Sequence, residues 1–161
     1  MMKIRRMVED DLEDVVEIAS LSFHGMRDRE KARKWIECNM RCYPRMQYFV
    51  AEDEEGRVLG YILWVEKGGF REKAVLELEQ IAVKPGFRGR GIGTKLVLDS
   101  LEEMKKYLEE RGSKLKLVIV TTGTENFAQR LYKKTLNAEV ECVIKNLFRG
   151  DEAIMIARFE E

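Results

Sequence analysis

The chain has 161 residues, 45% of them hydrophobic, which favours one globular domain over residues 1–161. Its 29 basic residues balance its 29 acidic residues, and this argues against a general nucleic-acid binder. No run of about 18 apolar residues occurs, so no membrane span is expected. The start, MMKIRRMVED, has no apolar signal core, and three cysteines are an odd number. We therefore expect free thiols and a cytoplasmic location.

The first part of the chain predicts a strand followed by two helices. Residues 3–8 alternate weakly between apolar and polar side chains, as a strand would. Apolar side chains then recur at helical spacing over residues 12–23. A more polar helix is expected over residues 28–41, with Trp35 and Ile36 as its apolar anchors.

The middle of the chain predicts a hairpin, a third strand and a long helix. Two β-rich runs flank an acidic turn at Glu55–Gly56, which is a hairpin signature. The third run, KAVLELEQIAV, stops before Pro85. A helix is expected over residues 92–111, closed by Gly112. Its apolar face would be formed by Ile92, Leu96, Val97, Leu101, Met104 and Leu108.

The last part of the chain predicts a buried strand, a short helix and a final hairpin. The run KLKLVIVTT is the strand, residues 125–135 form the helix, and the runs AEVECVIKNLF and EAIMIARF flank Arg149–Gly150. The order of elements is then β-α-α-β-β-β-α-β-α-β-β. It predicts an α+β fold of three α/β/α layers, in which helices flank a mixed, mostly antiparallel sheet.

The turn before the long helix reads RGRGIGTKL at residues 88–96 and places three glycines at alternate positions. Glycine is costly at a helix start, so its density there suggests that something approaches the backbone closely. The first amides of a helix have no internal partners and favour anions. With two arginines and a lysine nearby, the turn suits a phosphate group. A purely structural turn beside solvated arginines is the alternative.

Two nucleotide motifs do not fit this turn. A P-loop needs G-x-x-x-x-G-K-S/T, and here Ile92 and Gly93 follow the second glycine. A dinucleotide-binding turn needs G-x-G-x-x-G in a repeating βαβ frame, whereas these glycines are spaced G-x-G-x-G after several strands.

The segment VKPGFRGRGIG, residues 83–93, resembles the acetyl-coenzyme A signature of the GNAT superfamily of N-acetyltransferases, Q/R-x-x-G-x-G/A. Arg88, Gly91 and Gly93 occupy its defining positions. IRRMVEDDLEDVVEIASLSF, YFVAEDEEGRVLGYILWV, TENFAQRLYKK and DEAIMIARF resemble further blocks of the family in the same order. The resemblance implies the GNAT acyl-CoA N-acyltransferase fold. Lys133 to Ala138 depart from the family's usual E-K-x-G-F.

The resemblance implies acetyl-CoA as cosubstrate. No metal is expected, because no other Cys or His lies near enough in sequence to Cys38 and Cys42 to complete a zinc site. Backbone amides of residues 88–94 would hold the pyrophosphate, and the backbone at Ile81 and Val83 would pair with the pantetheine arm like an added strand. Lys133 and Lys134 would either touch the 3′-phosphate or form a solvated face. The expected cofactor-binding residues are Ile81, Ala82, Val83, Arg88, Gly89, Arg90, Gly91, Ile92, Gly93, Thr94 and Asn126.

The implied reaction is direct attack of an amine on the thioester, which needs a neutral amine and therefore a base. Glu77 and Glu79 lie two apart on one strand and share a face, so either could serve. A half-exposed charged strand face is the alternative. Tyr132 occupies the family's general-acid position. The alternative is that its side chain only packs in the core. A backbone N–H near Ile81 would meet the developing oxyanion.

We expect an acetyl-CoA-dependent N-acetyltransferase whose acceptor is a protein N-terminus, a lysine, a polyamine or a small amine. The acidic residues 52–55, together with Glu77 and Glu79, favour a cationic amine. The alternative is a non-catalytic acyl-CoA-binding module of the same fold. A mechanism with a cysteine nucleophile is disfavoured, because such a cysteine needs a base beside it. The one histidine, His24, lies in the first predicted helix, far from Cys142 in the sequence, and Cys142 is predicted to be core. Nucleic acid and membrane are not expected partners, and a homodimer is a further expectation.

Overall fold

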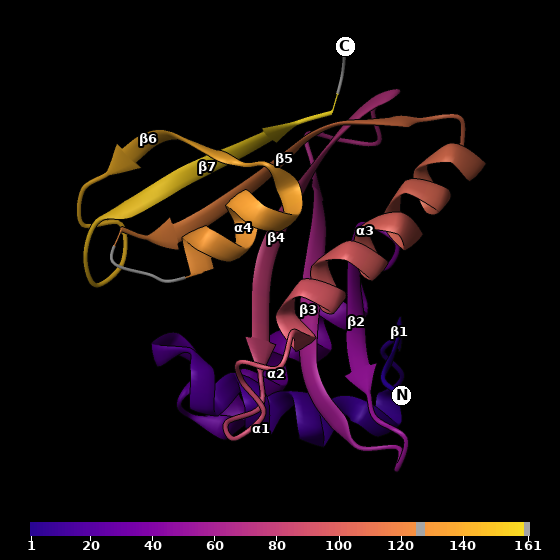
Figure 1. Ribbon diagram of the computed structural model, residues 1–161, viewed down its shortest axis with the longest axis vertical. Helices are drawn as coiled ribbons and strands as arrows, with labels where there is room; N and C mark the ends of the chain where they lie inside the picture. Colours follow the sequence, from indigo (N-terminus) through magenta and orange to yellow (C-terminus); the bar gives the residue numbers. More distant parts are fainter. Residues whose placement is uncertain (125–127, 160–161) are drawn as a thin grey trace. The chain divides into compact units, whose positions relative to one another are not determined.

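The structure is a computed structural model that describes residues 1–124 and 128–159. Within those residues the predicted elements appear in the predicted order (Figure 1). Their bounds are β1 (Lys3–Arg6), α1 (Leu12–Ser22), α2 (Arg29–Met40), β2 (Met46–Glu52), β3 (Val58–Lys67), β4 (Lys73–Val83), α3 (Ile92–Glu110), β5 (Lys114–Gly123), α4 (Ala128–Leu136), β6 (Glu139–Ile144) and β7 (Glu152–Arg158).

The strands form a mixed sheet in the order β1-β2-β3-β4-β5-β7-β6. β4 and β5 are parallel, from Lys73 opposite Lys114 to Glu77 opposite Ile119. The chain between them contains α3, as a parallel connection requires. The pairs β1–β2, β5–β7 and β6–β7 are antiparallel. The expected mixture of parallel and antiparallel pairing is therefore present.

The chain divides into two compact units. Unit 1 contains residues 1–64 and 80–101, and unit 2 contains residues 65–79 and 102–161. β3, β4 and α3 each contribute residues to both units. That residues 1–161 act as a single domain stays a prediction.

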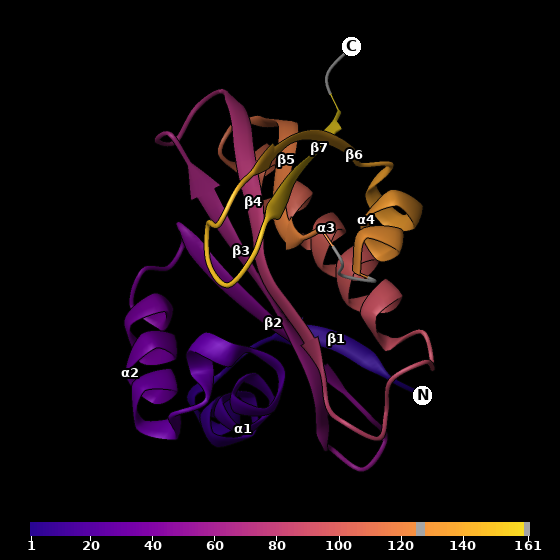
Figure 2. The same cartoon turned by 90° about the vertical axis from the view of Figure 1, so that its left-hand side faces the viewer.

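In unit 1, α1 and α2 lie side by side, and α2 contacts β2 (Figure 2). The inner face of α2 consists of Ala32, Ile36 and Asn39, which recur at helical spacing and are buried. Ile36 is fully buried, as predicted, but Trp35 is 52% exposed. The prediction for Trp35 was wrong because neighbouring helical residues point about 100° apart, so both cannot lie on one narrow inner face.

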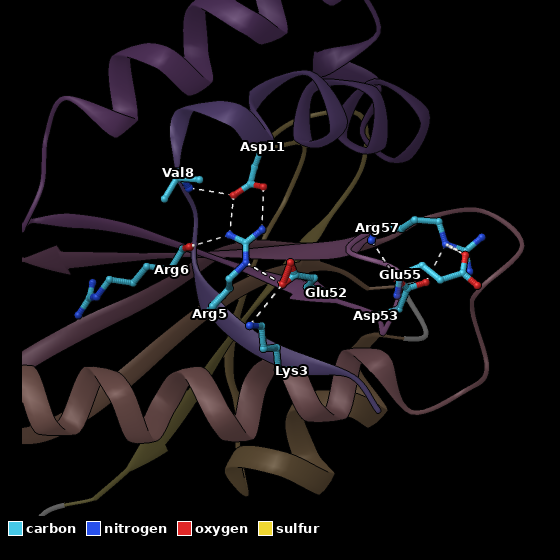
Figure 3. A network of polar contacts seen from close by, with 9 residues as sticks. All are labelled: Lys3, Arg5, Arg6, Val8, Asp11, Glu52, Asp53, Glu55 and Arg57. Atoms are coloured by element: carbon cyan, nitrogen blue, oxygen red, sulfur yellow. Dashed lines mark hydrogen bonds and ion pairs between the residues drawn. The ribbon is translucent and has the colours of Figure 1, made fainter.

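Arg5 on β1 fixes the entry to the first helices (Figure 3). Its guanidinium donates to both carboxylate oxygens of Asp11, at 2.8 and 2.9 Å, and its Nε donates to Glu52 at 3.2 Å. Asp11 also accepts the Val8 amide at 2.8 Å. Burial opposes ionisation of Asp11, but the bonds from Arg5 and Val8 outweigh it and hold its pKa below the ordinary value.

The long helix α3 has the predicted apolar face, since Ile92, Leu96, Val97, Leu101, Met104 and Leu108 are all buried. In unit 1, Trp64 Nε1 donates to Ser100 Oγ at 2.8 Å and links β3 to this helix. Gly112, at φ +83°, ends α3 as predicted, and the Ser113 amide bonds back to the Leu108 carbonyl at 2.8 Å.

In unit 2, β7 lies between β5 and β6, and α4 contacts β5. Residues Ala153, Met155 and Ala157 of β7 are buried and alternate with half-buried ones. β6 is exposed along its whole length because it is the last strand of the sheet. The prediction that Cys142 is core was therefore wrong, since its thiol is exposed on β6.

Candidate active site

The turn between β4 and α3 has a backbone that requires glycine. Gly86, Gly89 and Gly91 have φ values of +93°, +79° and +79°, a region that other residues rarely adopt. A Cβ atom built on any of the three would meet nothing within 4 Å. The glycines are therefore needed for conformation, and open space lies in front of them in which a ligand could approach the backbone.

The N-terminus of α3 follows directly from this turn. Its first helical hydrogen bond runs from the Lys95 amide to the Gly91 carbonyl, at 3.1 Å. The amides of Ile92, Gly93 and Thr94 come before that bond and meet no acceptor within residues 1–124 and 128–159. These amides and the helix dipole make the turn favourable for an anion.

Two exposed arginines flank the turn. Arg88 Nε donates to the Val83 carbonyl at 3.1 Å, and this bond ties the turn to the end of β4. The Arg90 guanidinium lies 5.2 Å from the centre of the Phe87 ring. Lys95 instead forms an ion pair with Asp99 at 2.7 Å, so its charge is largely compensated within α3.

The end of β4 lies in unit 1 with the glycine turn. Ala82 is buried, whereas Ile81 and Val83 are half-buried, as alternation along a strand requires. A Cβ on Gly60 of β3 would lie 2.8 Å from the Ala82 carbonyl oxygen, so only glycine allows this approach. The expected cofactor-binding residues 81–83 and 88–94 thus lie in the same compact unit.

The two candidate bases lie on the unit 2 part of β4. Glu77 and Glu79 are both half-buried, while the alternating Leu76 and Leu78 are buried. The register shift of this strand falls between Ala74 and Val75, before the glutamates, so the two carboxylates share one face. This arrangement is the one that the sequence predicts.

Lys67 is a residue of this region that the sequence did not single out. Its ammonium lies 3.3 Å from the Glu77 carboxylate. The pairing of β4 with β5 ends at Glu77 opposite Ile119, although β5 continues to Gly123 in its pairing with β7. A lysine at a strand end carries no local sequence signal for such a contact, because the partner strand decides it.

Tyr132 lies on α4 in unit 2 and is 5% exposed. Burial raises the pKa of its phenol to about 12. The side chain therefore keeps its proton at neutral pH and can donate it in a hydrogen bond. Lys133 and Lys134 follow it as exposed residues in the last turn of α4.

Other expected features have different outcomes. Asn126 lies outside the described residues. Cys38, Cys42 and Cys142 are free, as expected. Within the described part of the chain, no group of three or more His, Cys, Asp or Glu residues could hold a metal ion. No helix among those residues is long and apolar enough to cross a bilayer.

Residues 12–137 match the model of the GNAT acetyltransferase family. The match spans most of the chain and contains the glycine turn, both glutamates and Tyr132. The chain belongs to the GNAT acetyltransferase family.

Two archaeal relatives carry no finer assignment. An uncharacterised N-acetyltransferase of Methanocaldococcus jannaschii is 29% identical over 91% of this chain and 64% of its own length. One from Archaeoglobus fulgidus is 31% identical over 81% of this chain and 89% of its own length. The chain thus spans less than two thirds of the first relative.

Solved structures show the same fold. Ard1 from Thermoplasma volcanium superposes with a TM-score of 0.78 over 99% of both chains, at 21% identity. A ribosomal-protein-alanine N-acetyltransferase from Brucella melitensis gives 0.72 over 98% of this chain and 99% of its own, at 25% identity. The predicted α+β GNAT fold is confirmed by these similarities.

Proposed function

We propose that the protein is an N-acetyltransferase that transfers the acetyl group of acetyl-CoA to a primary amine by direct attack in a ternary complex. The observation that carries this proposal is the glycine turn before α3. It combines positive φ values, open space before the glycines and helix-start amides without acceptors among the described residues. These features fit the pyrophosphate of coenzyme A. Among the ligands that contain a pyrophosphate, membership of the GNAT acetyltransferase family favours acetyl-CoA.

Residues of unit 1 would hold the cosubstrate. The amides of residues 88–94 would bind the pyrophosphate, with Arg88 and Arg90 adding positive charge. The backbone of Ile81 and Val83 would pair with the pantetheine arm. The Val83 carbonyl already accepts a bond from Arg88, which supports a role for that arginine in fixing the strand end. Acetyl-CoA would supply the activated acetyl thioester.

Residues of unit 2 would carry the proton transfers. Glu77 or Glu79, directly or through water, would take the proton from the amine. Tyr132 would donate its proton to the departing thiolate. Burial raises its pKa to about 12, so the phenol is protonated at neutral pH and is present as a hydrogen-bond donor to the thiolate, although this shift also makes it a weaker acid.

The acceptor is a primary amine on a peptide or small molecule. The neighbour from Brucella melitensis is named for a ribosomal-protein alanine, which supports a protein N-terminus among the candidates. Lysines, polyamines and small amines stay open alternatives. A cytoplasmic location and a homodimer stay predictions. Independence of a metal ion is also a prediction, and turnover that is unchanged by EDTA would support it.

The proposal is tested first by ligand-dependent thermal stability. Acetyl-CoA, CoA, ATP and NAD are compared, and a ligand at about 100 times its dissociation constant adds about 2.7 kcal/mol. We expect stabilisation by acetyl-CoA and CoA only. Thiol release is then measured with panels of peptides and amines. Stabilisation by ATP or NAD alone would contradict the proposal. Binding of acetyl-CoA without turnover of any acceptor would favour a non-catalytic acyl-CoA-binding module.

A further inference from the structure

A cationic groove of about 630 Å³ lies in unit 2, at the turn between β3 and β4. Four of its lining side chains are cationic and one is anionic, in a chain whose overall charge is zero. Its volume is within the range of small-ligand and peptide sites. The lining residues are Lys67, Gly68, Arg71, Glu72, Lys73, Val75 and Lys116.

Positive side chains from neighbouring strands come together at this groove. Lys73 on β4 lies opposite Lys114 on β5, which runs parallel to it. Lys116, two residues further on, is exposed and adds a third positive charge to the same region. Arg71 Nε donates to the Gly68 carbonyl at 2.9 Å, which holds the guanidinium at the turn. An anionic ligand would add negative charge among these cations.

The groove is directly connected to a candidate base. Lys67 lines the groove, and its ammonium lies 3.3 Å from the Glu77 carboxylate. One face of β4 presents, at alternate positions, Lys73, Val75, Glu77 and Glu79. The same strand face therefore carries a cation of the groove at one end and the two candidate bases further along. At about 3.3 Å per residue, Lys73 lies about 13 Å from Glu77 and about 20 Å from Glu79.

We propose that this groove binds the acidic side chains of a peptide acceptor whose amine lies at Glu77 and Glu79. The proposal rests on the proposed acetyltransferase function and narrows its substrate class. An extended peptide advances about 3.3 to 3.6 Å per residue. The distance from the glutamates to Lys73 thus corresponds to acidic residues about four to six positions from the acetylated amine.

A peptide fits the groove better than a nucleic acid does. The four cations of the groove come from the turn between β3 and β4 and from the strands β3, β4 and β5, whereas a nucleic-acid site needs a longer basic stripe and usually a basic domain. The chain has equal numbers of basic and acidic residues. Val75 also adds an apolar side chain to the lining of the groove, which suits the side chains of a peptide.

The test compares two peptides that share a free N-terminal amine and differ only at positions five to seven, which are glutamates in one and alanines in the other. Binding is followed by fluorescence anisotropy of C-terminally labelled peptide, and acetylation by thiol release. We expect the acidic peptide to bind at least tenfold more tightly and to have the higher kcat/KM. Lys116→Glu should lower the acidic-to-neutral ratio of kcat/KM about tenfold. Lys34→Glu, an exposed charge reversal on α2, is the matched control and should keep that ratio.

The outcomes separate this proposal from the function on which it rests. Tight, Lys116-dependent binding of the acidic peptide without any acetylation would support the groove and count against the enzyme. Acetylation of both peptides with equal efficiency would overturn the groove and leave the enzyme. A single-stranded oligonucleotide that binds more tightly than the acidic peptide, and loses binding in Lys116→Glu, would also overturn the peptide as occupant.

Discussion

Lys67 on β3 forms an ion pair with Glu77 on β4, with the ammonium 3.3 Å from the carboxylate. If Glu77 is the base, Glu77→Gln should lower kcat by about 10² to 10⁴. The loss of the ion pair should cost at most about 1 kcal/mol of stability, because both side chains are partly exposed. Kinetics with the neutral peptide and urea denaturation measure the two effects.

Lys67→Met is the control for that experiment, because it removes the same ion pair and keeps the carboxylate. Equal losses of kcat in Lys67→Met and Glu77→Gln would assign the effect to the ion pair and not to a base. Glu79→Gln, measured in parallel, decides between the two glutamates. If both single variants keep full turnover, neither carboxylate is the base.

Tyr132→Phe should lower kcat strongly and leave the dissociation constant of acetyl-CoA unchanged, because it removes only the proposed proton donor. Tyr107 on α3 offers a matched control, since its hydroxyl lies 3.0 Å from Arg111 Nη1 and has no proposed role in catalysis. Tyr107→Phe should keep the turnover of the wild type. Unchanged kcat in Tyr132→Phe would remove this residue from the proposed chemistry.

The raised pKa of Tyr132 predicts a pH-dependent loss of stability. The folded protein keeps this proton up to about pH 12, whereas the unfolded chain releases it near pH 10. Unfolding is therefore favoured as pH rises through this window, by up to about 2.7 kcal/mol. Urea denaturation at several pH values should show this loss in the wild type and not in Tyr132→Phe. A constant difference between them from pH 9 to 11.5 would contradict the burial of the phenol.

Gly91→Ala should abolish acetyl-CoA binding. The substitution places a methyl group in the open space before the turn and strains a backbone at φ +79°, at a cost of about 1 to 3 kcal/mol. Gly56→Ala is the control, because Gly56 has φ +80° and equally open surroundings in the β2–β3 hairpin. Both variants should lose similar stability by thermal melting, and only Gly91→Ala should lose the ligand. Equal acetyl-CoA affinity in the two variants would place the pyrophosphate elsewhere.

Asp11→Asn should destabilise the fold by about 1 to 3 kcal/mol at pH 7, because it removes one of the two carboxylates that pair with the partly buried Arg5 and leaves only Glu52. The pKa of Asp11 is lowered, so its contribution is present above the ordinary value of 3.8 and disappears as pH falls through the lower folded value. Denaturation near pH 7 and pH 2 measures this difference. Asp10→Asn, an exposed neighbour, should stay within about 0.5 kcal/mol of the wild type at both.

Local patterns predicted the elements because they depend on neighbouring residues. The face of α3 from Ile92 to Leu108 follows from a period of about 3.6 residues, and Gly112 ends the helix by its backbone freedom. The glycine turn could be found in the same way. The burial of Trp35 was predicted wrongly because it depends on which face of α2 packs against the rest of the protein. The burial of Cys142 was predicted wrongly because it depends on which strand lies at the edge of the sheet.

The sequence by itself determined the order of elements and the shared face of Glu77 and Glu79, and it predicted that the turn at residues 88–94 favours an anion. Each of these rests on contacts within a few residues of chain. Only the tertiary structure decided that Lys67, Lys73 and Lys116, from three different strands, line one groove and that Lys67 contacts Glu77. Such neighbours come from strand order and register, which long-range pairing determines and no local spacing encodes.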